Sequence, residues 1–278
     1  MALIVFTDLD GSLMEHETYS IEPAKRALDE LTARKIPLIL NSSKTAAEMT
    51  MIQELLDLHC PFICENGAAL HLGTDEIIEF GKQRETWLEA VHQLRARHSY
   101  SFHGFSDWSP SEISSITGLT TAQADQAKTR FYSEPILWRD SESALQRFLD
   151  ELQEMELRLL QGGRFLSIQG NYDKSDGMRS MVSDNLEQNR ERSLITVALG
   201  DSPNDAAMLN AADIAVIIKS GKSSLIHCPA PQKIIHTKIP GPAGWNEAIL
   251  EILALYDSGQ LENSRIAVAT TNNPITGN

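Results

Sequence analysis

Short continuous runs of apolar residues alternate along this chain with longer stretches in which apolar residues recur every three or four positions. The short runs have the pattern of strands buried on both faces of a parallel sheet. They are Leu3–Phe6, Ile36–Leu40, Phe62–Cys64, Ile195–Leu199 and Ile214–Ile218. The helical spacing follows at residues 22–31, 45–56 and around Met208 and Leu209. Such alternation predicts an α/β fold with a doubly wound, mainly parallel sheet.

The pattern changes between residues 83 and 168. This stretch contains an amphipathic helix at 84–97, a loop rich in serine and aromatic residues at 99–111, a helix at 141–155 and a hairpin-like pair joined at Gly162 and Gly163. We interpret residues 83–168 as an α+β cap inserted into a core domain made of residues 1–82 and 169–260. The polar tail, residues 261–278, is expected to be loosely ordered.

Charge narrows the class of partner. The 278 residues include 24 Lys and Arg against 38 Asp and Glu, a formal net charge of −14. A surface this acidic repels the phosphates of nucleic acid, so general nucleic-acid binding is not expected. A small phosphorylated substrate would need local cations that overcome the overall field.

The cysteines and apolar runs bear on location. Three cysteines, Cys60, Cys64 and Cys228, form no CxxC pair and do not suggest a disulfide framework. No apolar run approaches the length of a membrane span, and no basic-then-apolar leader opens the chain. We therefore expect no membrane partner and a reducing, cytoplasmic location. The oligomeric state is left open.

Polar clusters follow three of the predicted strands, at the edge where open α/β sheets bind ligands. Asp8 and Asp10 come directly after the first strand, with Gly11 allowing a sharp turn, and Asp201 follows a later strand. Carboxylates this close repel one another unless a cation or a shared proton relieves them. A hard divalent ion with oxygen ligands, Mg²⁺, meets that need.

Cations and a hydroxyl complete the candidate chemistry. Lys44 and Lys174 supply positive charge, and Ser42 offers a hydroxyl just before a predicted helix start. Ser42 serves equally as a plain helix cap, and Lys44 as a surface cation. Together with the carboxylates, these groups are suited to phosphoryl transfer.

In this order and context, four segments resemble the four motifs of the haloacid dehalogenase superfamily of phosphatases: residues 8–12 (DLDGS), Ser42, Lys174 and residues 200–205 (GDSPND). Residues 65–68 resemble the lead-in to the caps of Cof-type sugar phosphatases. A finer resemblance, to the mannosyl-3-phosphoglycerate phosphatase family, lies in residues 42–45, 130–138, 162–165 and 173–174. The sequence departs from these patterns at Ser12, where Thr is usual, and at residues 175–177.

The resemblance implies roles for the core residues. Asp8 would be the nucleophile and Asp10 the general acid and base, while Ser42 and Lys174 would hold the phosphoryl oxygens. It also implies a Mg²⁺ site at Asp8, Asp10 through its carbonyl, Asp201 and Asp205, supported by Asn204.

In the cap, the resemblance implies that Arg130 and Arg164 bind the glycerate carboxylate of the substrate. In the core, it implies that Lys44 and Asn204 also bind the substrate. Glu134 would accept from sugar hydroxyls or pair with Arg130. Alternatively, both arginines are solvent-facing strand residues. The implied activity is a Mg²⁺-dependent hydrolysis of a glycosyl-3-phosphoglycerate through an aspartyl phosphate. A phosphatase of simple sugar phosphates and a catalytically spent sugar-phosphate-binding protein are the alternatives.

Overall fold

A computed structural model describes residues 2–15, 18–73, 76–162, 164–188, 194–231 and 233–261. The chain divides into two compact units, residues 1–38 with 182–278, and residues 39–181. The predicted tail beyond residue 261 and Gly163 of the predicted turn lie outside the described residues. The predicted domain bounds at residues 82, 168 and 260 stay a prediction.

The first unit contributes four strands to an eight-stranded sheet, in the order β12, β11, β10, β1. They are β1 (Ala2–Thr7), β10 (Leu194–Gly200), β11 (Ile214–Lys219) and β12 (Lys233–Pro240), and all neighbouring pairs are parallel. Strands β1 and β10 run in register from Ala2 opposite Leu194 to Thr7 opposite Leu199. Their carboxyl ends therefore lie side by side.

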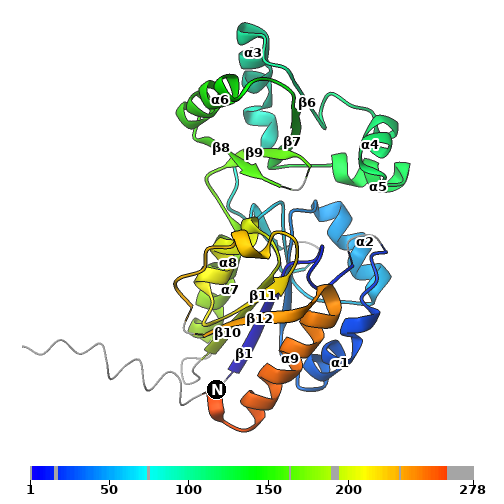
Figure 1. The fold of residues 1–278 in the computed structure, drawn as a ribbon, viewed down its shortest axis with the longest axis vertical. Helices are drawn as coiled ribbons and strands as arrows, with labels where there is room; N and C mark the ends of the chain where they lie inside the picture. The colour runs from blue at the N-terminus through cyan, green and yellow to red at the C-terminus, as the bar shows by residue number, and fades with distance from the viewer. Residues whose placement is uncertain are drawn as a thin grey trace, which may run out of the picture. The chain divides into compact units, whose positions relative to one another are not determined.

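Helices flank these strands. The 3-10 turn η1 (Glu22–Ala24) leads into α1 (Lys25–Ala33), and η3 (Pro203–Asp205) leads into α8 (Ala206–Ala211). After η4 (Ser223–Leu225) and β12 comes α9 (Gly241–Asp257), which packs against α1, β11 and β12 (Figure 1). The sequence patterns did not predict β12 or α9. Strand β12 has only partly buried or exposed residues, so it lacks the apolar run that marks the inner strands.

The second unit begins with the other half of that sheet. It contains β2 (Leu38–Asn41), α2 (Ala46–Leu56), β3 (Phe62–Cys64), β4 (Ala69–His71) and β5 (Ile77–Glu79). Strands β2 and β3 are parallel, whereas β3, β4 and β5 are antiparallel. The predicted capping box is present, with Thr45 and Glu48 each accepting from the other's backbone N–H. The unit ends in α7 (Lys174–Gln188), which continues into the first unit.

A separate antiparallel sheet lies within the second unit, in the order β6 (Phe102–Gly104), β7 (Ser133–Trp138), β9 (Leu166–Gly170) and β8 (Leu157–Gln161). The 3-10 turn η2 (Arg84–Thr86) precedes α3 (Leu88–His98), which packs with α6 (Glu142–Glu154) against one face of this sheet through an apolar cluster. The antiparallel pairing of β8 and β9 confirms the predicted hairpin.

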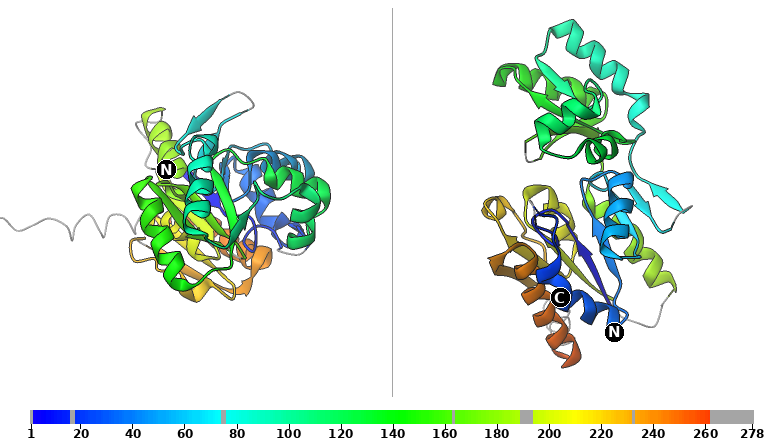
Figure 2. Two further views of the ribbon diagram at one scale, coloured as in Figure 1. Left: turned by 90° about the horizontal axis from the view of Figure 1, so that it is seen from above. Right: turned by 90° about the vertical axis from the view of Figure 1, so that its right-hand side faces the viewer.

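Helix α7 and two further helices of the second unit were not predicted. Helices α4 (Pro110–Thr117) and α5 (Thr121–Lys128) pack against each other (Figure 2), and Ile113, Ala124 and Ala127 of these helices form a small apolar cluster with Phe105. The loop predicted at residues 99–111 contains β6 and Ser109, the N-cap of α4, and Thr120 caps α5. Together the two sheets confirm the predicted α/β class. In the described part of the chain, no helix is both long and apolar enough to cross a bilayer.

Candidate active site

Three carboxylates of the first unit converge at the ends of β1 and β10. One oxygen each from Asp8, Asp201 and Asp205 lies within 4.8 Å of the others. Asp8 is only 6% exposed and Asp205 is fully buried. Negative charges this close and this buried repel strongly unless a cation neutralises them. The donor set consists of hard oxygen ligands, which fits a small divalent cation.

Backbone geometry brings the first two carboxylates together. The N–H of Asp8 donates to the carbonyl of Leu199 at 2.9 Å, which continues the β1 and β10 pairing beyond the strand. Gly11 then turns the chain with φ +81°, and a Cβ at that position would lie 2.9 Å from Oδ2 of Asp201. Only glycine combines this φ with so close an approach to the Asp201 carboxylate.

The loop after β10 is shaped around Asp205. Its Oδ2 accepts the backbone N–H groups of Asp201 and Ser202, each at 3.0 Å. The Ser202 hydroxyl donates to Asn204, and the carbonyl of Asp201 accepts the Ser220 hydroxyl at 2.7 Å. Asp205 therefore orients the loop that presents Asp201, while Asn204 is tied into the same turn.

Asp10 lies outside this group of three carboxylates. It is partly exposed and forms a bridge with Met14 in the turn after β1. Its predicted roles, in proton transfer and as a metal ligand through its carbonyl, stay predictions.

Sequence reasoning missed a support beneath Asp8. The Thr7 hydroxyl donates to the Asp8 carbonyl at 2.8 Å, and the indole N–H of Trp245 donates to the Thr7 oxygen at 2.9 Å. Trp245 is fully buried in α9. No local pattern links residues 238 positions apart, so this contact is visible only in the folded chain.

In the second unit, the structure brings the Ser42 and Lys174 segments together. Both residues are fully buried. Asn41, next to Ser42, donates from Nδ2 to the carbonyl of Lys174 at 2.7 Å. Close packing at Gly67 supports the approach, because a Cβ there would lie 1.9 Å from the carbonyl oxygen of Asp173. Lys44 is partly exposed in the loop after Ser42.

The predicted substrate residues of the cap are engaged within the fold. Arg130 is buried and lies 3.6 Å from Glu65 across an ion pair. Glu134 is 2% exposed and pairs with Arg84 at 2.8 Å rather than with Arg130. It shares a face of β7 with Ile136, the face that α3 and α6 cover, which strand alternation could have indicated. The predicted substrate contacts of Arg130 and Glu134 stay predictions.

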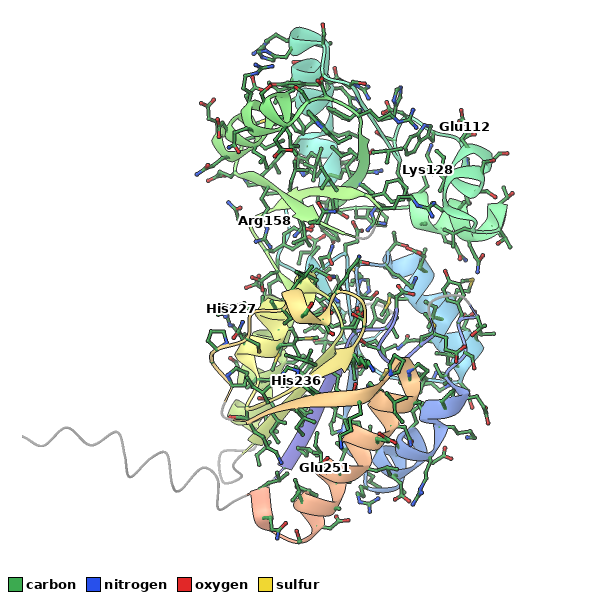
Figure 3. All side chains as sticks on the ribbon, viewed as in Figure 1. Glu112, Lys128, Arg158, His227, His236 and Glu251 are labelled. Carbon is green, nitrogen blue, oxygen red and sulfur yellow. The ribbon has the colours of Figure 1, made fainter. Side chains whose placement is uncertain are left out.

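Other basic side chains of the second unit also bind main-chain oxygens. Lys128 and Arg158, labelled in Figure 3, donate to the carbonyls of Trp108 and Tyr172. The exposed Arg164 donates to a carbonyl of α4, that of Ile116. These three basic side chains therefore bind the backbone of their own unit.

Comparison with known proteins gives consistent matches. The family model for haloacid dehalogenase-like hydrolase matches residues 5–228. A glucosyl-3-phosphoglycerate/mannosyl-3-phosphoglycerate phosphatase of Methanococcoides burtonii is 34% identical over 268 residues, which cover 91% of this chain and 98% of the relative.

Solved structures share the fold at low identity. A protein of Streptococcus mutans superposes with a TM-score of 0.66 at 18% identity, covering 91% of this chain and all of the other. A subclass IIB sugar phosphatase of the same superfamily gives 0.65 at 18% identity, with 90% of this chain and 99% of the other covered. A superfamily phosphatase of Bacteroides thetaiotaomicron gives 0.63 at 16% identity, with 90% and 95% covered. At these identities the likeness concerns the fold alone.

Proposed function

Because the chain belongs to the haloacid dehalogenase-like hydrolases, we propose that it is a phosphomonoesterase that acts on a glycosyl-3-phosphoglycerate and releases glycosylglycerate and phosphate. The observation that carries the proposal is the buried carboxylate group of Asp8, Asp201 and Asp205 at the strand ends. The substrate class rests on the relative that is 34% identical over nearly its whole length. A small phosphorylated sugar of this kind is the expected partner.

In the first half-reaction, a carboxylate oxygen of Asp8 attacks the phosphorus of the ester. The bond between phosphorus and the glycerate oxygen breaks, and an aspartyl phosphate forms on Asp8. Asp10 donates its proton to the departing oxygen. Asp10 is suited to this exchange because it is partly exposed and lies outside the carboxylate group.

In the second half-reaction, Asp10 takes a proton from a water molecule that attacks the phosphorus of the aspartyl phosphate. The bond between phosphorus and the Asp8 oxygen breaks, and inorganic phosphate leaves. Asp8 regains its carboxylate and Asp10 its proton. The two displacements return the chain to its starting state.

Asp8, Asp201, Asp205 and the carbonyl of Asp10 would hold the Mg²⁺ ion. When bound, Mg²⁺ supplies positive charge that offsets the repulsion between the Asp8 carboxylate and the dianionic substrate. The Asp205 carboxylate holds the Asp201 loop in place by accepting hydrogen bonds from the backbone N–H groups of Asp201 and Ser202.

Ser42 and Lys174 are proposed to bind the oxygens of the transferring phosphoryl group. Both are fully buried, so their hydroxyl and ammonium groups act where little water screens them. The Asn41 contact to the Lys174 carbonyl supports their joint action, since it fixes one segment against the other.

A substrate panel tests the proposal. Phosphate release would be measured in Mg²⁺ with mannosyl- and glucosyl-3-phosphoglycerate, mannose 6-phosphate, sucrose 6-phosphate and p-nitrophenyl phosphate. We expect the largest kcat/KM for a glycosyl-3-phosphoglycerate. Higher values for the simple sugar phosphates would favour the alternative substrate class. No release from any ester would leave only a binding protein.

A further inference from the structure

The loop that follows Ser42 is held by three consecutive carbonyl groups. The Ser42 carbonyl accepts the N–H of Asn66 at 2.9 Å, and the Lys44 carbonyl accepts the N–H of Glu65 at 2.8 Å. Between them, the Ser43 carbonyl accepts Nη2 of Arg130 at 2.7 Å. The path of this loop is therefore set by residues 65–66 and by one arginine from a segment 87 positions away.

Glu65 connects the same arginine to the entry of β7. Its fully buried carboxylate accepts the N–H groups of Phe131 and Tyr132 at 2.8 and 3.2 Å and the Ser133 hydroxyl at 2.6 Å. It also lies 3.6 Å from Nε of Arg130. Glu65 thus binds the Ser42–Lys44 loop through its backbone N–H and the segment before β7 through its side chain.

The contacts of Arg130 leave each of its nitrogens occupied. Nε donates to the Ser133 hydroxyl at 3.0 Å, Nη1 to the Ala127 carbonyl at 3.3 Å and Nη2 to the Ser43 carbonyl. Three of the five N–H groups of this guanidinium are therefore used within the fold, and its side chain is only 7% exposed. Their geometry suits the fixed fork of arginine, which lysine does not reproduce.

Backbone strain points to the same place. Glu65 and Asn66 have φ angles of +46° and +61°. Residues other than glycine adopt this region rarely, and they persist there when surrounding contacts over-determine it. Here those contacts are the ones that hold the Ser42 loop.

We propose that Arg130 and Glu65 form a clip that positions the Ser42–Lys44 loop, so that both are positioning residues for the phosphoryl-binding hydroxyl rather than ligands of the substrate. This proposal rests on the proposed function, since it assigns Ser42 to the phosphoryl group. Glu65 and Arg130 each contact both the loop and the segment that begins β7, so the clip joins the antiparallel sheet to the Ser42 loop.

The clip and a substrate-binding Arg130 make opposite predictions about substrate range. Misplacing the Ser42 hydroxyl affects every phosphomonoester, because all present the same phosphoryl group. Losing a ligand for the glycerate carboxylate affects only substrates that carry one. Displacement of a catalytic group by about 1 Å can reduce the rate about 100-fold.

The test uses the full chain with Arg130→Met, Arg130→Lys and Glu65→Gln. The matched control is Arg95→Met, because Arg95 also binds a carbonyl, that of Phe102, and pairs with Asp107 in the second unit. For each variant, kcat and KM would be measured with mannosyl-3-phosphoglycerate and with p-nitrophenyl phosphate. Amide hydrogen exchange at residues 65 and 66 would report directly on the loop contacts.

We expect Arg130→Met to lower kcat/KM at least about tenfold for both esters and to speed exchange at residues 65 and 66, while Arg95→Met changes neither. Arg130→Lys and Glu65→Gln should show smaller effects of the same kind, which keeps the test valid if Arg130→Met fails to fold. A loss confined to the carboxylated ester, or exchange no faster than in the control, would overturn the proposal. If the unmodified chain hydrolyses neither ester, the proposed function fails, and exchange alone still decides the clip.

Discussion

Replacing Gly67 with alanine tests how the Lys174 segment is positioned. Gly67 has φ +103°, and a Cβ there would lie 1.9 Å from the carbonyl oxygen of Asp173 and 2.8 Å from the backbone nitrogen of Lys174. Ordinary contacts of this kind begin at 3.4 Å. The Asp173 carbonyl would therefore have to move away by the difference, about 1.5 Å. Because Lys174 is the next residue, this movement would displace Lys174 as well.

The magnitude has two parts. The unfavourable φ of a non-glycine residue costs about 1–2 kcal/mol, and overpacking adds about 1–3 kcal/mol. We therefore expect Gly67→Ala to lower the free energy of unfolding by about 2–5 kcal/mol in urea titrations. Because a shift of about 1 Å can reduce the rate about 100-fold, kcat/KM for p-nitrophenyl phosphate should fall by about that factor.

Gly118 provides a matched control. It ends α4 with φ +86°, yet a Cβ there would meet nothing within 4 Å. Gly118→Ala should therefore carry only the conformational cost, about 1–2 kcal/mol, and leave kcat/KM unchanged. Equal activity of the two variants would show that the approach of Gly67 to Asp173 does not position Lys174, and the reasoning would be refuted.

Two further predictions concern the metal site and pH. Gly11→Ala should raise the Mg²⁺ concentration for half-maximal activity about tenfold or more, because the new Cβ displaces the Asp201 carboxylate; an unchanged Mg²⁺ titration would contradict this. His71 stacks on Phe62 with ring centroids 4.5 Å apart, and burial lowers the pKa of its imidazole. The unfolded chain therefore binds the proton more readily than the folded chain. The free energy of unfolding should consequently fall as the pH drops below about 6.5. Urea titrations at pH values of about 7.5 and 5.5 should show a smaller loss of free energy of unfolding in His71→Phe than in the unmodified chain. Equal losses in the two proteins would exclude His71 as the source.

The inner strands could be predicted from the sequence because each is buried along its length. Strand β10, for example, is buried at all seven residues, and Thr196 is the one polar side chain in its otherwise apolar run. Strand β12 and helix α9 escaped prediction for different reasons. Strand β12 is mostly exposed and lacks a continuous apolar run. Helix α9 does carry apolar residues at helical spacing, at Trp245, Ala248, Ile249 and Ile252, but the prediction did not use this pattern.

Some residues of the candidate site could be predicted from the sequence, whereas others come together only in the folded chain. Asp8 and Asp201 stand in short motifs after predicted strands, and the structure places their carboxylates together with that of Asp205. Glu65 and Arg130 meet only after folding, since their contacts span about 65 positions. The resemblance implied that Arg130 binds the substrate, which stays a prediction, and it singled out residues 65–68 without indicating that Glu65 pairs with Arg130.

Phosphate release from mannosyl-3-phosphoglycerate in Mg²⁺, compared between the unmodified chain and Asp8→Asn, tests the central claim most directly. Asparagine has nearly the shape of aspartate but lacks the carboxylate that attacks phosphorus. We expect release by the unmodified chain and a loss of at least about 1,000-fold in Asp8→Asn, with the variant folded as judged by its urea titration. Comparable release by the two proteins would contradict an aspartyl-phosphate mechanism at Asp8.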